Sequence, residues 1–317
     1  MNTPKISIIL MTYNQDKYLH RAIQSALSQT YENIEILISN NGSSDDTTNV
    51  VQSFLPNKKI TYLNYPENKS PNLRANQAID LASGDFISWL YGDDYYLDEK
   101  IQTQMQAFNS LDKSYGVVYG PGYIYNASYN KKVISSCLNY SGYCLEKFLV
   151  RWLKDGNINP ISPLVRRDCY NFHRPGSEIF TEGEVLYLHL AASLKFFYLD
   201  KPLVVMTDHE SNLGKQIESN LATHVQSILR LLKENNLPKK TEQLVYSHLC
   251  ERKIIDCWHC FRANKNIPWA REVLKSAFTI SKLSCVKNKF FWLSSIMLFL
   301  PKNFQRLIAN LFPVAGS

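Results

Sequence analysis

Two adjacent carboxylates, Asp93 and Asp94, follow an apolar segment near the end of the first hundred residues. That segment, Phe86–Leu90, is typical of a buried strand. Two negative charges side by side are unfavourable unless a cation lies near them. Carboxylates on a loop are hard oxygen ligands, which suit Mg²⁺ or Mn²⁺ when substrate phosphates complete the coordination. The alternative is that one of the two caps a helix that begins near Asp98.

A second polar cluster, Asn40–Asp46, follows another apolar run, Ile34–Ser39. Its amides and hydroxyls lie on a turn-rich segment and could contact a ligand. The alternative is an ordinary loop in which Ser44 or Asp45 caps the next helix. The sequence contains no P-loop motif, no Gly-x-Gly-x-x-Gly that opens a helix after a strand, and no Gly-x-Ser-x-Gly. P-loop, dinucleotide-binding and serine-hydrolase classes are therefore disfavoured.

The segments that must position these clusters alternate between short apolar runs and helical patterns. Such alternation predicts right-handed crossovers and an α/β fold with a mostly parallel sheet. Ligands bind beyond the carboxyl ends of the strands in such sheets, where both polar clusters and Thr12–Asn14 lie. The expected strands are Ile6–Met11, Ile34–Ser39, Ile60–Asn64 and Phe86–Leu90, and the expected helices are Asp16–Thr30, Asp45–Leu55 and Leu73–Ser83.

The pattern changes along the rest of the chain. Residues 100–210 mix helix and strand, including expected strands at Gly116–Tyr119 and Leu203–Met206. Beyond Asn212 the pattern is largely helical, which places a domain boundary near 212 and predicts regions 1–212 and 213–317. The expected helices there are Gln216–Glu234, Glu242–Phe261 and Trp269–Ile280.

The net charge of +7 over 317 residues is unevenly distributed. Residues 1–214 hold 19 basic and 22 acidic residues, whereas residues 215–317 hold 16 and 6. After Glu272 there are six basic residues and no acidic one. This asymmetry predicts an electrostatic partner for the C-terminal region alone. A nucleic-acid partner is disfavoured because the basic region lacks a recognisable binding motif.

An uncharged apolar run, Phe290–Leu300, lies in this basic region. As a helix it would be about 16 Å long, too short for a hydrocarbon core of roughly 30 Å. A helix lying in the interface of an anionic membrane fits both the length and the charge. The alternative is a helix packed on its own domain. The basic residues that flank the run are Lys287, Lys289, Lys302 and Arg306.

The seven cysteines are odd in number and irregularly spaced. Because Met1–Lys5 leads directly into an apolar strand rather than a signal peptide, we expect reduced thiols in a cytoplasmic protein. Cys257 and Cys260 have the spacing of half a zinc site, but no second pair is evident, so a structural role is favoured.

Taken in order, five motifs resemble the family-2 inverting glycosyltransferases, which have the A-type nucleotide-sugar-binding fold (GT-A). The resemblance is dense over residues 5–95 and thinner to about 210. It divides the first region into a donor half, about 1–100, and an acceptor half, about 101–212. The five motifs are Ile6–Asn14, Ala22–Tyr31, Ile36–Thr47, Asn76 with Ala82–Asp85, and Leu90–Asp94.

The resemblance implies roles for the donor-side residues. Thr12, Tyr13 and Asn14 would line the base and ribose pocket, and Asn40 stands where the family has an aspartate that reads uracil. Asp93 would coordinate Mg²⁺ or Mn²⁺, although Tyr91 replaces the first aspartate of the Asp-x-Asp motif. The other residues that would contact the donor are Asn76, Tyr91, Gly92 and Asp94, the last also as an alternate metal ligand.

The resemblance also implies a catalytic base and a histidine near the diphosphate or metal. The family's base lies in a Glu-Asp pair that opens a helix, and the aspartate position here is Gly183. Glu182 or Glu184 would then serve, with Glu182 favoured; the alternative is that both are first-turn helix acids. His209 matches the family's histidine after its last strand, with an ordinary surface histidine as the alternative.

The implied activity is inverting transfer of a sugar from a nucleotide-diphosphate donor, a UDP-sugar, to a hydroxyl of a glycan or lipid-linked acceptor. The setting would be bacterial cell-surface polysaccharide synthesis at the cytoplasmic face of the membrane. One alternative is a non-catalytic protein that binds a sugar nucleotide or a synthase partner. Another is a nucleotidyltransferase, which should carry a Gly-rich basic loop that Thr12–Lys17 does not resemble.

Overall fold

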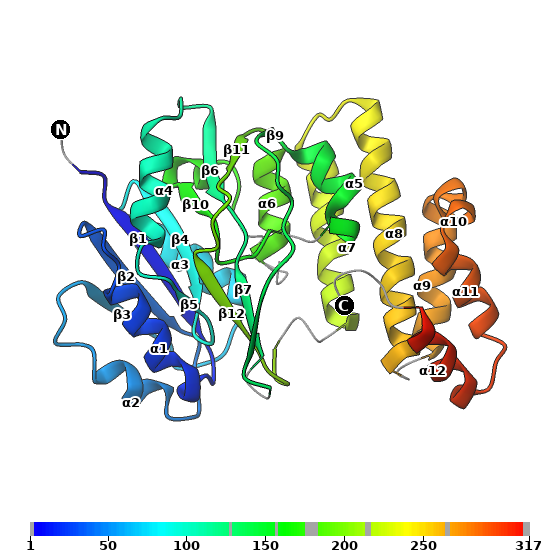
Figure 1. The fold of residues 1–317 in the computed structure, drawn as a ribbon, viewed down its shortest axis with the longest axis horizontal. Helices are drawn as coiled ribbons and strands as arrows, with labels where there is room; N and C mark the ends of the chain where they lie inside the picture. The colour runs from blue at the N-terminus through cyan, green and yellow to red at the C-terminus, as the bar shows by residue number, and fades with distance from the viewer. Residues whose placement is uncertain are drawn as a thin grey trace. The chain divides into compact units, whose positions relative to one another are not determined.

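The computed structural model describes residues 3–126, 129–155, 158–174, 183–212, 217–263 and 267–312. The chain divides into two compact units, which we describe separately (Figure 1). The first comprises Met1–Cys144 and Ile158–Glu210, and the second comprises Leu145–Asn157 and Ser211–Ser317. The segment Leu145–Asn157, which the sequence places inside region 1–212, therefore groups with the C-terminal helices.

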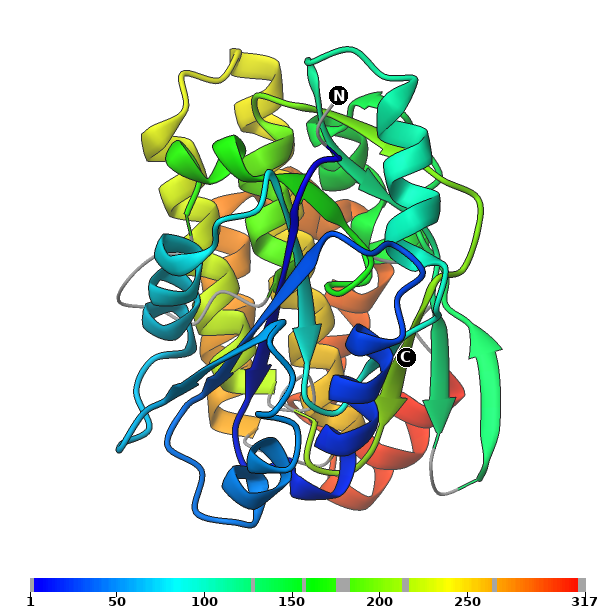
Figure 2. The ribbon, with the colours of Figure 1, turned by 90° about the vertical axis from the view of Figure 1, so that its left-hand side faces the viewer.

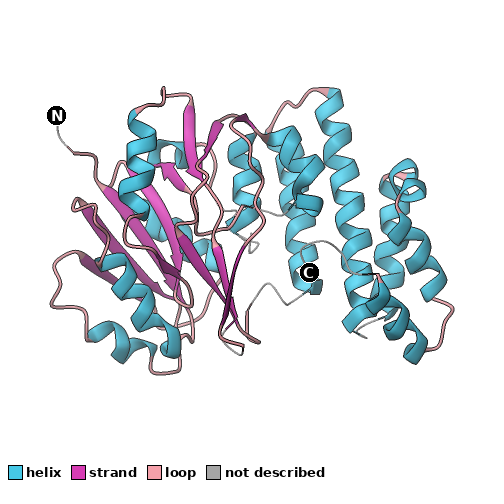
Figure 3. Cartoon of the chain, in the orientation of Figure 1, coloured by secondary structure: helices cyan, strands magenta, loops and turns pink. Residues whose placement is uncertain are grey.

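The first unit is an α/β unit built on a large mixed sheet, and the expected fold class is confirmed. Its strand order is β3-β2-β1-β4-β10-β6-β11-β9, with the four donor-half strands all parallel. Figure 3 shows the strands of this unit in magenta. The strands are β1 (Ile6–Thr12), β2 (Ile34–Asn40), β3 (Ile60–Asn64), β4 (Phe86–Tyr91), β6 (Tyr115–Tyr119), β9 (Gly142–Tyr143), β10 (Leu164–Arg166) and β11 (Lys195–Tyr198).

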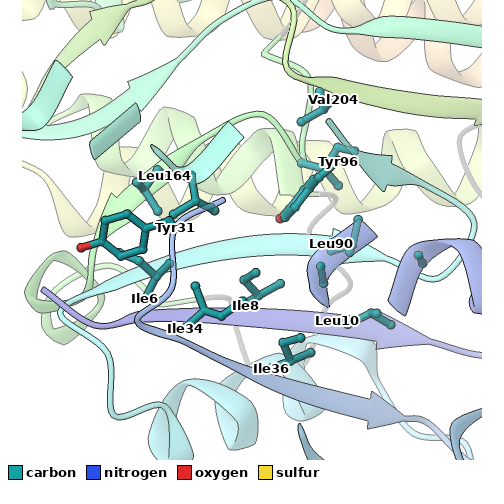
Figure 4. Close-up of a cluster of buried hydrophobic side chains, with 14 of the residues drawn as sticks. Ile6, Ile8, Leu10, Tyr31, Ile34, Ile36, Leu90, Tyr96, Leu164 and Val204 are labelled. Carbon is teal, nitrogen blue, oxygen red and sulfur yellow. The ribbon is translucent and has the colours of Figure 1, made fainter. Parts of the chain in front are cut away.

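Helices cover both faces of the donor-half strands (Figure 2). The even-numbered residues Ile6, Ile8 and Leu10 of β1 join one apolar cluster with α1 and α4 (Figure 4). Helix α3 packs against β1 and β2 from the other face. Because side chains alternate between the two faces and both faces are covered, β1 is apolar except at Ser7 and Thr12, which are also buried. The helices of this unit are α1 (Asp16–Leu27), α2 (Thr47–Gln52), α3 (Pro71–Leu81), α4 (Lys100–Asn109) and α6 (Gly183–Ala191), with a 3₁₀ turn at Arg167–Asn171.

A second, four-stranded sheet in the same unit has the order β5-β12-β7-β8. Its strand β5 directly follows Asp93 and Asp94, and β12 pairs with it antiparallel through Val204 and Tyr96. This pairing brings the residues after β12 close to the turn after β4. The strands are β5 (Tyr95–Tyr96), β7 (Tyr123–Asn126), β8 (Lys131–Ile134) and β12 (Val204–Asp208).

The second unit consists of helices in the part of it that the structure describes. Helix α8 packs against α5, α7, α9, α10, α11 and α12, and its Trp258 and Phe261 are buried in the centre of the core. Among the described residues, none of the helices combines the length and the apolar character that crossing a membrane requires. The helices are α5 (Leu145–Asp155), α7 (Ile217–Glu234), α8 (Lys239–Ala263), α9 (Ile267–Ile280), α10 (Lys282–Lys287), α11 (Lys289–Met297) and α12 (Lys302–Leu311).

Helix α5 joins this unit because α8 supplies its partners. The Thr241 hydroxyl donates to Glu146 Oε1 at 2.8 Å, and His248 Nδ1 lies 3.2 Å from the carbonyl oxygen of Leu149. These contacts link residues almost a hundred positions apart, so the sequence pattern of α5 alone could not indicate them.

The cysteines of the helical unit are buried, and among the described residues they form no disulfide. Cys257 and Cys260 lie in its apolar core, and the described residues contain no group of three or more His, Cys, Asp or Glu side chains placed to hold a metal. The favoured structural role therefore agrees with their surroundings. The close pair is instead Cys250 and Cys285, whose sulfur atoms are 3.3 Å apart across α8 and α10.

Two histidines of α8, the buried His248 and the half-buried His259, should make the stability of this unit depend on pH. Burial, with the nearby charge of Arg252, lowers the pKa of His248 to about 4, and burial with nearby arginines does the same for His259. Because these values lie below the unfolded value of about 6.5, the unfolded chain binds more protons as pH falls through that window. We expect each histidine to lower the free energy of unfolding by about 1 kcal/mol at pH 5.5 relative to pH 7.5.

Thermal unfolding of the full chain at the two pH values measures this effect. His248→Gln with His259→Gln should reduce the pH dependence, whatever its effect on absolute stability. Part of it should remain, because burial also lowers the pKa of His224, which lies 3.0 Å from His248. The matched control is His20→Gln, on the exposed surface of α1. An unchanged pH slope in the double variant would contradict the prediction.

Candidate active site

The turns after β1, β2 and β4 meet at the carboxyl edge of the sheet. The backbone N–H of Asn14 donates to Ser43 Oγ at 2.9 Å, and the N–H of Ser44 donates to Asn14 Oδ1 at 2.8 Å. Asn14 has a φ of 51°, in the left-handed region that asparagine tolerates better than most residues. The N–H of Gly92 donates to the carbonyl oxygen of Met11 at 2.9 Å. Three predicted donor-side segments are therefore brought together.

The backbone of Gly92 lies so close to the side chains of Thr12 and Gln15 that a larger residue would not fit without a shift. A Cβ atom there would lie 2.7 Å from the Thr12 hydroxyl and 2.6 Å from Gln15 Oε1. The Thr12 side chain is buried beneath the turn, and its hydroxyl has no hydrogen-bond partner among the described residues. Of the three residues expected to line the base and ribose pocket, Tyr13 and Asn14 are the exposed ones.

Asn40 is fully buried, and both ends of its amide are engaged by the protein. Its Oδ1 accepts from the hydroxyl of Ser43 at 2.6 Å, and its Nδ2 donates to the hydroxyl of Tyr62 at 2.9 Å and to Asn64 Oδ1 at 3.1 Å. These bonds join the end of β2 to β3 and to the turn that follows β2. The expected contact between Asn40 and a nucleobase would have to replace one of them.

Asn41 and Arg74 form a buried cluster that the sequence did not indicate. The guanidinium of Arg74 donates from Nε to Asn41 Oδ1 at 3.0 Å and from Nη2 to the carbonyl oxygen of Glu67 at 2.9 Å. It also lies 3.6 Å from the centre of the Tyr65 ring. The only available signal was a basic residue on the inward face of α3. This cluster fixes the segment after β3 against the turn after β2.

Asp45 accepts hydrogen bonds from the first residues of two helices. Its carboxylate oxygens lie 3.1 Å from the N–H groups of Asp16 and Thr47, which begin α1 and α2. Both bonds lower the pKa of the Asp45 carboxyl, against the effect of its partial burial. Asp45 therefore binds the start of both helices, but the N-cap position of α2 is Asp46 rather than Ser44 or Asp45, which the alternative expected.

Asp93 and His209 form the polar pair at the centre of the site. His209 Nε2 lies 3.1 Å from Asp93 Oδ2, although the two residues are 116 positions apart. The Tyr18 ring of α1 stacks on the His209 ring, with 4.7 Å between centroids and 14° between planes. His209 is therefore held at the site rather than exposed as an ordinary surface histidine, and Tyr18 is a contact that the sequence did not indicate.

Asp94 is buried directly behind this pair. Its Oδ1 accepts from the N–H of Thr207 at 2.9 Å, and the Thr207 hydroxyl accepts from Arg21 Nη2 at 2.8 Å. Burial and the negative charge of Asp93 raise the pKa of Asp94, against the Thr207 bond and the charge of Arg21. Neither aspartate caps a helix, because α4 begins at Lys100 with Glu99 at its N-cap position. The helix-cap alternative is therefore wrong.

The residues fit a divalent cation. Asp93 offers a carboxylate oxygen and His209 an imidazole nitrogen from one small volume, and a cation there would offset the repulsion between Asp93 and Asp94. A carboxylate with further oxygen ligands suits Mn²⁺ or Mg²⁺, and imidazole is a common ligand of transition metals. Since the described residues supply no third His, Cys, Asp or Glu ligand here, phosphate oxygens of a substrate would have to complete the coordination.

The remaining candidates are placed only in part. Glu182 lies outside the described residues, and Glu184 belongs to α6, which begins at Gly183, but its side chain is not described. Asn76 is half-buried in α3, and Tyr91 is half-buried at the end of β4. Their predicted roles stay predictions.

Sequence comparisons place the first unit among known proteins. Residues 7–171, more than half of the chain, match the family described as Glycosyl transferase family 2. An uncharacterized glycosyltransferase of Rickettsia prowazekii is 42% identical over 117 residues, which are 37% of this chain and 36% of that protein. The GalNAc(5)-diNAcBac-PP-undecaprenol beta-1,3-glucosyltransferase of Campylobacter jejuni is 38% identical over 119 residues, 37% of this chain and 38% of that protein. The matched segments thus span little more than a third of these relatives.

Structural comparisons cover almost the whole chain. The S. aureus TarS 1–349 structure in complex with UDP aligns with a TM-score of 0.67 at 15% identity, over 96% of this chain and 88% of that one. The mannosyltransferase PcManGT from Pyrobaculum calidifontis, in complex with GDP-Man and Mn²⁺, aligns with a TM-score of 0.59 at 12% identity, over 98% and 85%. These likenesses establish the GT-A fold that the five motifs implied. With the family match over residues 7–171, they show that the chain belongs to glycosyl transferase family 2.

Proposed function

We propose that the protein transfers a sugar from a nucleotide-diphosphate donor, a UDP-sugar, to a hydroxyl of a glycan or lipid-linked acceptor, with inversion at the anomeric carbon. The observation that carries this proposal is the Asp93–His209 pair, 3.1 Å apart at the edge where the turns after β1 and β4 meet. It offers metal ligands at the position where an α/β sheet of this kind binds its ligands.

The residues of the site would have separate roles in this reaction. Asp93 and His209 would hold Mg²⁺ or Mn²⁺ together with the donor diphosphate, and a cation so bound offsets negative charge on the leaving group. Tyr18 and Arg21 would keep His209 and Thr207 in place during turnover. The protein would supply positioning and electrostatic stabilisation rather than a covalent intermediate.

The acceptor half would supply the base. Glu182, or Glu184 as the alternative, would take the proton from the acceptor hydroxyl while its oxygen attacks the anomeric carbon. The new carbon–oxygen bond forms on the face opposite the leaving diphosphate, whose bond to the same carbon breaks. A single displacement of this kind inverts the configuration.

The choice of substrates rests on the named relatives. TarS is described in complex with UDP and UDP-GlcNAc, and PcManGT with GDP-Man and Mn²⁺. The Campylobacter jejuni relative is named for an undecaprenol-linked acceptor. These names support a sugar nucleotide as donor and a lipid-linked glycan as acceptor. As a further part of the proposal, the protein would act peripherally at the cytoplasmic face of a bacterial membrane in polysaccharide synthesis.

A donor screen of the purified full chain tests the proposal. We expect UDP-sugars with Mn²⁺ to raise the thermal unfolding temperature, because a ligand that binds only the folded state stabilises it. We also expect release of UDP when a lipid-linked acceptor is added. Stabilisation without any transfer or donor hydrolysis would favour the non-catalytic alternative, which the Gly183 departure motivates. No stabilisation by any sugar nucleotide would overturn the proposal.

A further inference from the structure

Helices α11 and α12 and the turn between them expose apolar side chains that are not part of the core around α8. The exposed residues are Trp292 and Ile296 of α11, Phe299 in the turn that follows α11, and Phe304, Leu307 and Leu311 of α12. Their exposed fractions range from 51% to 87%. We call these six residues the C-terminal apolar face. The four-residue spacing on α11, and the spacings of three and four residues on α12, place the members of each helix on one side of that helix.

The opposite sides of the same helices are packed. Phe290, Leu293 and Met297 of α11 and Ile308 of α12 belong to the core around Trp258, and both helices pack against α8. Two bonds from the Gln305 amide nitrogen, 2.8 Å to the carbonyl oxygen of Met297 and 2.9 Å to that of Leu300, join α12 to the end of α11. Figure 1 shows α10, α11 and α12 following one another in orange and red. The exposed side chains are therefore held outward by an ordered core.

Exposed apolar side chains are unfavourable in water, so we expect a partner to cover these residues when the protein functions. The positive charge of this region indicates which partner would cover the C-terminal apolar face. Lys282, Lys287 and Lys289 are exposed, and no acidic residue follows Glu272. A second copy of the chain would oppose the same positive charges, whereas an anionic bilayer offers both an apolar interior and negative headgroups.

We infer that the C-terminal apolar face is the surface by which the protein docks on an anionic lipid bilayer. Trp292 and the phenylalanines would enter the interface, and the three lysines would contact the headgroups. This inference deepens the proposed function by naming the surface that brings the protein to a lipid-linked acceptor. Vesicle binding requires neither donor nor metal, so it can fail or succeed independently of sugar transfer.

Co-sedimentation of the full chain with vesicles is the first test. We expect binding to phosphatidylcholine vesicles that contain about one-third phosphatidylglycerol, and weak binding to phosphatidylcholine alone. Each lysine near an anionic surface contributes roughly a fivefold factor in affinity. Lys282→Gln/Lys287→Gln/Lys289→Gln should therefore weaken binding about 100-fold. The matched control is Lys58→Gln/Lys113→Gln/Lys131→Gln, which removes three exposed charges from the first unit and should change binding far less.

The apolar contribution is tested by Phe299→Ser/Phe304→Ser/Leu307→Ser, for which we expect at least tenfold weaker binding. Phe172→Ser, which removes a comparably exposed phenylalanine from the first unit, should leave binding unchanged. Circular dichroism and thermal unfolding check that the variants keep the fold. If wild-type protein fails to bind anionic vesicles, or if both triple variants bind as wild type does, the inference is wrong.

Tryptophan fluorescence locates the contact between the protein and the bilayer. Lipids brominated near the headgroup should quench tryptophan fluorescence of the wild type, and Trp292→Phe should remove most of that quenching while retaining binding. Quenching that persists in Trp292→Phe would place the contact elsewhere. Dimerisation in analytical ultracentrifugation that the apolar variant abolishes, without vesicle binding, would assign the face to a second copy and overturn the lipid assignment.

Discussion

Replacement of Asp93 by asparagine is expected to lower the rate of sugar transfer by at least about a thousandfold, or roughly 4 kcal/mol of transition-state stabilisation. Asparagine keeps the shape of the side chain but removes the charge that faces His209 at 3.1 Å. The fold should be retained, because Asp93 is one source of the raised pKa of Asp94 and its neutralisation removes a repulsion. The measurement is the initial transfer rate as a function of Mn²⁺ concentration.

Asp200→Asn is the matched control, since Asp200 is an exposed aspartate of the same unit that accepts a hydrogen bond from the Tyr198 hydroxyl at 3.0 Å. It should transfer sugar at the wild-type rate. If Asp93→Asn stays within tenfold of wild type at saturating Mn²⁺, Asp93 does not hold the metal.

The second large effect concerns the base. Glu182→Gln is expected to lower the transfer rate by about 10²- to 10⁴-fold, because glutamine cannot accept the proton of the acceptor hydroxyl. Glu184→Gln, two positions away in the first turn of α6, should lose less than tenfold. The pH dependence of kcat/KM separates a base from a merely structural glutamate, since loss of the base removes the rise in rate on its acidic side.

A rescue variant sharpens this comparison. Gly183 stands where the family has its aspartate, so Gly183→Asp in the Glu182→Gln background should restore part of the lost rate. A large loss in Glu184→Gln with wild-type activity in Glu182→Gln would reverse the assignment. Wild-type activity in both single variants and in the double variant would exclude this segment as the source of the base.

Local patterns in the sequence predicted much of the first unit. The apolar runs at Ile6–Met11, Ile34–Ser39, Ile60–Asn64 and Phe86–Leu90 are strands β1 to β4, each within one residue at either end. A strand buried on both faces is mostly apolar, so a run of apolar residues in the sequence locates it. The carboxyl ends of those strands then indicated the edge at which Asn14 contacts Ser43 and Gly92 contacts Met11.

The end of the second helix and the last apolar run were predicted less well than the three long C-terminal helices, which lie within three residues of their expected ends. The helix expected at Asp45–Leu55 is only Thr47–Gln52, and the expected run Phe290–Leu300 is divided between α11, which ends at Met297, and the turn that follows. The tail was expected either to lie on a membrane or to pack on its own domain, whereas one side of α11 packs and the other is exposed. Apolar content does not distinguish a packed side from an exposed one.

The sequence by itself determined the strands, their polar ends, the family resemblance and the candidate ligand Asp93, because each depends on neighbouring residues. The tertiary structure decided which distant residues complete the site. His209 reaches Asp93 only because β12 pairs with β5, and Tyr18 stacks on it only because α1 lies alongside. It likewise decided that Asn40 is saturated by partners from β3. Strand order and packing across a sheet depend on contacts between residues far apart in the chain, and no local period records them.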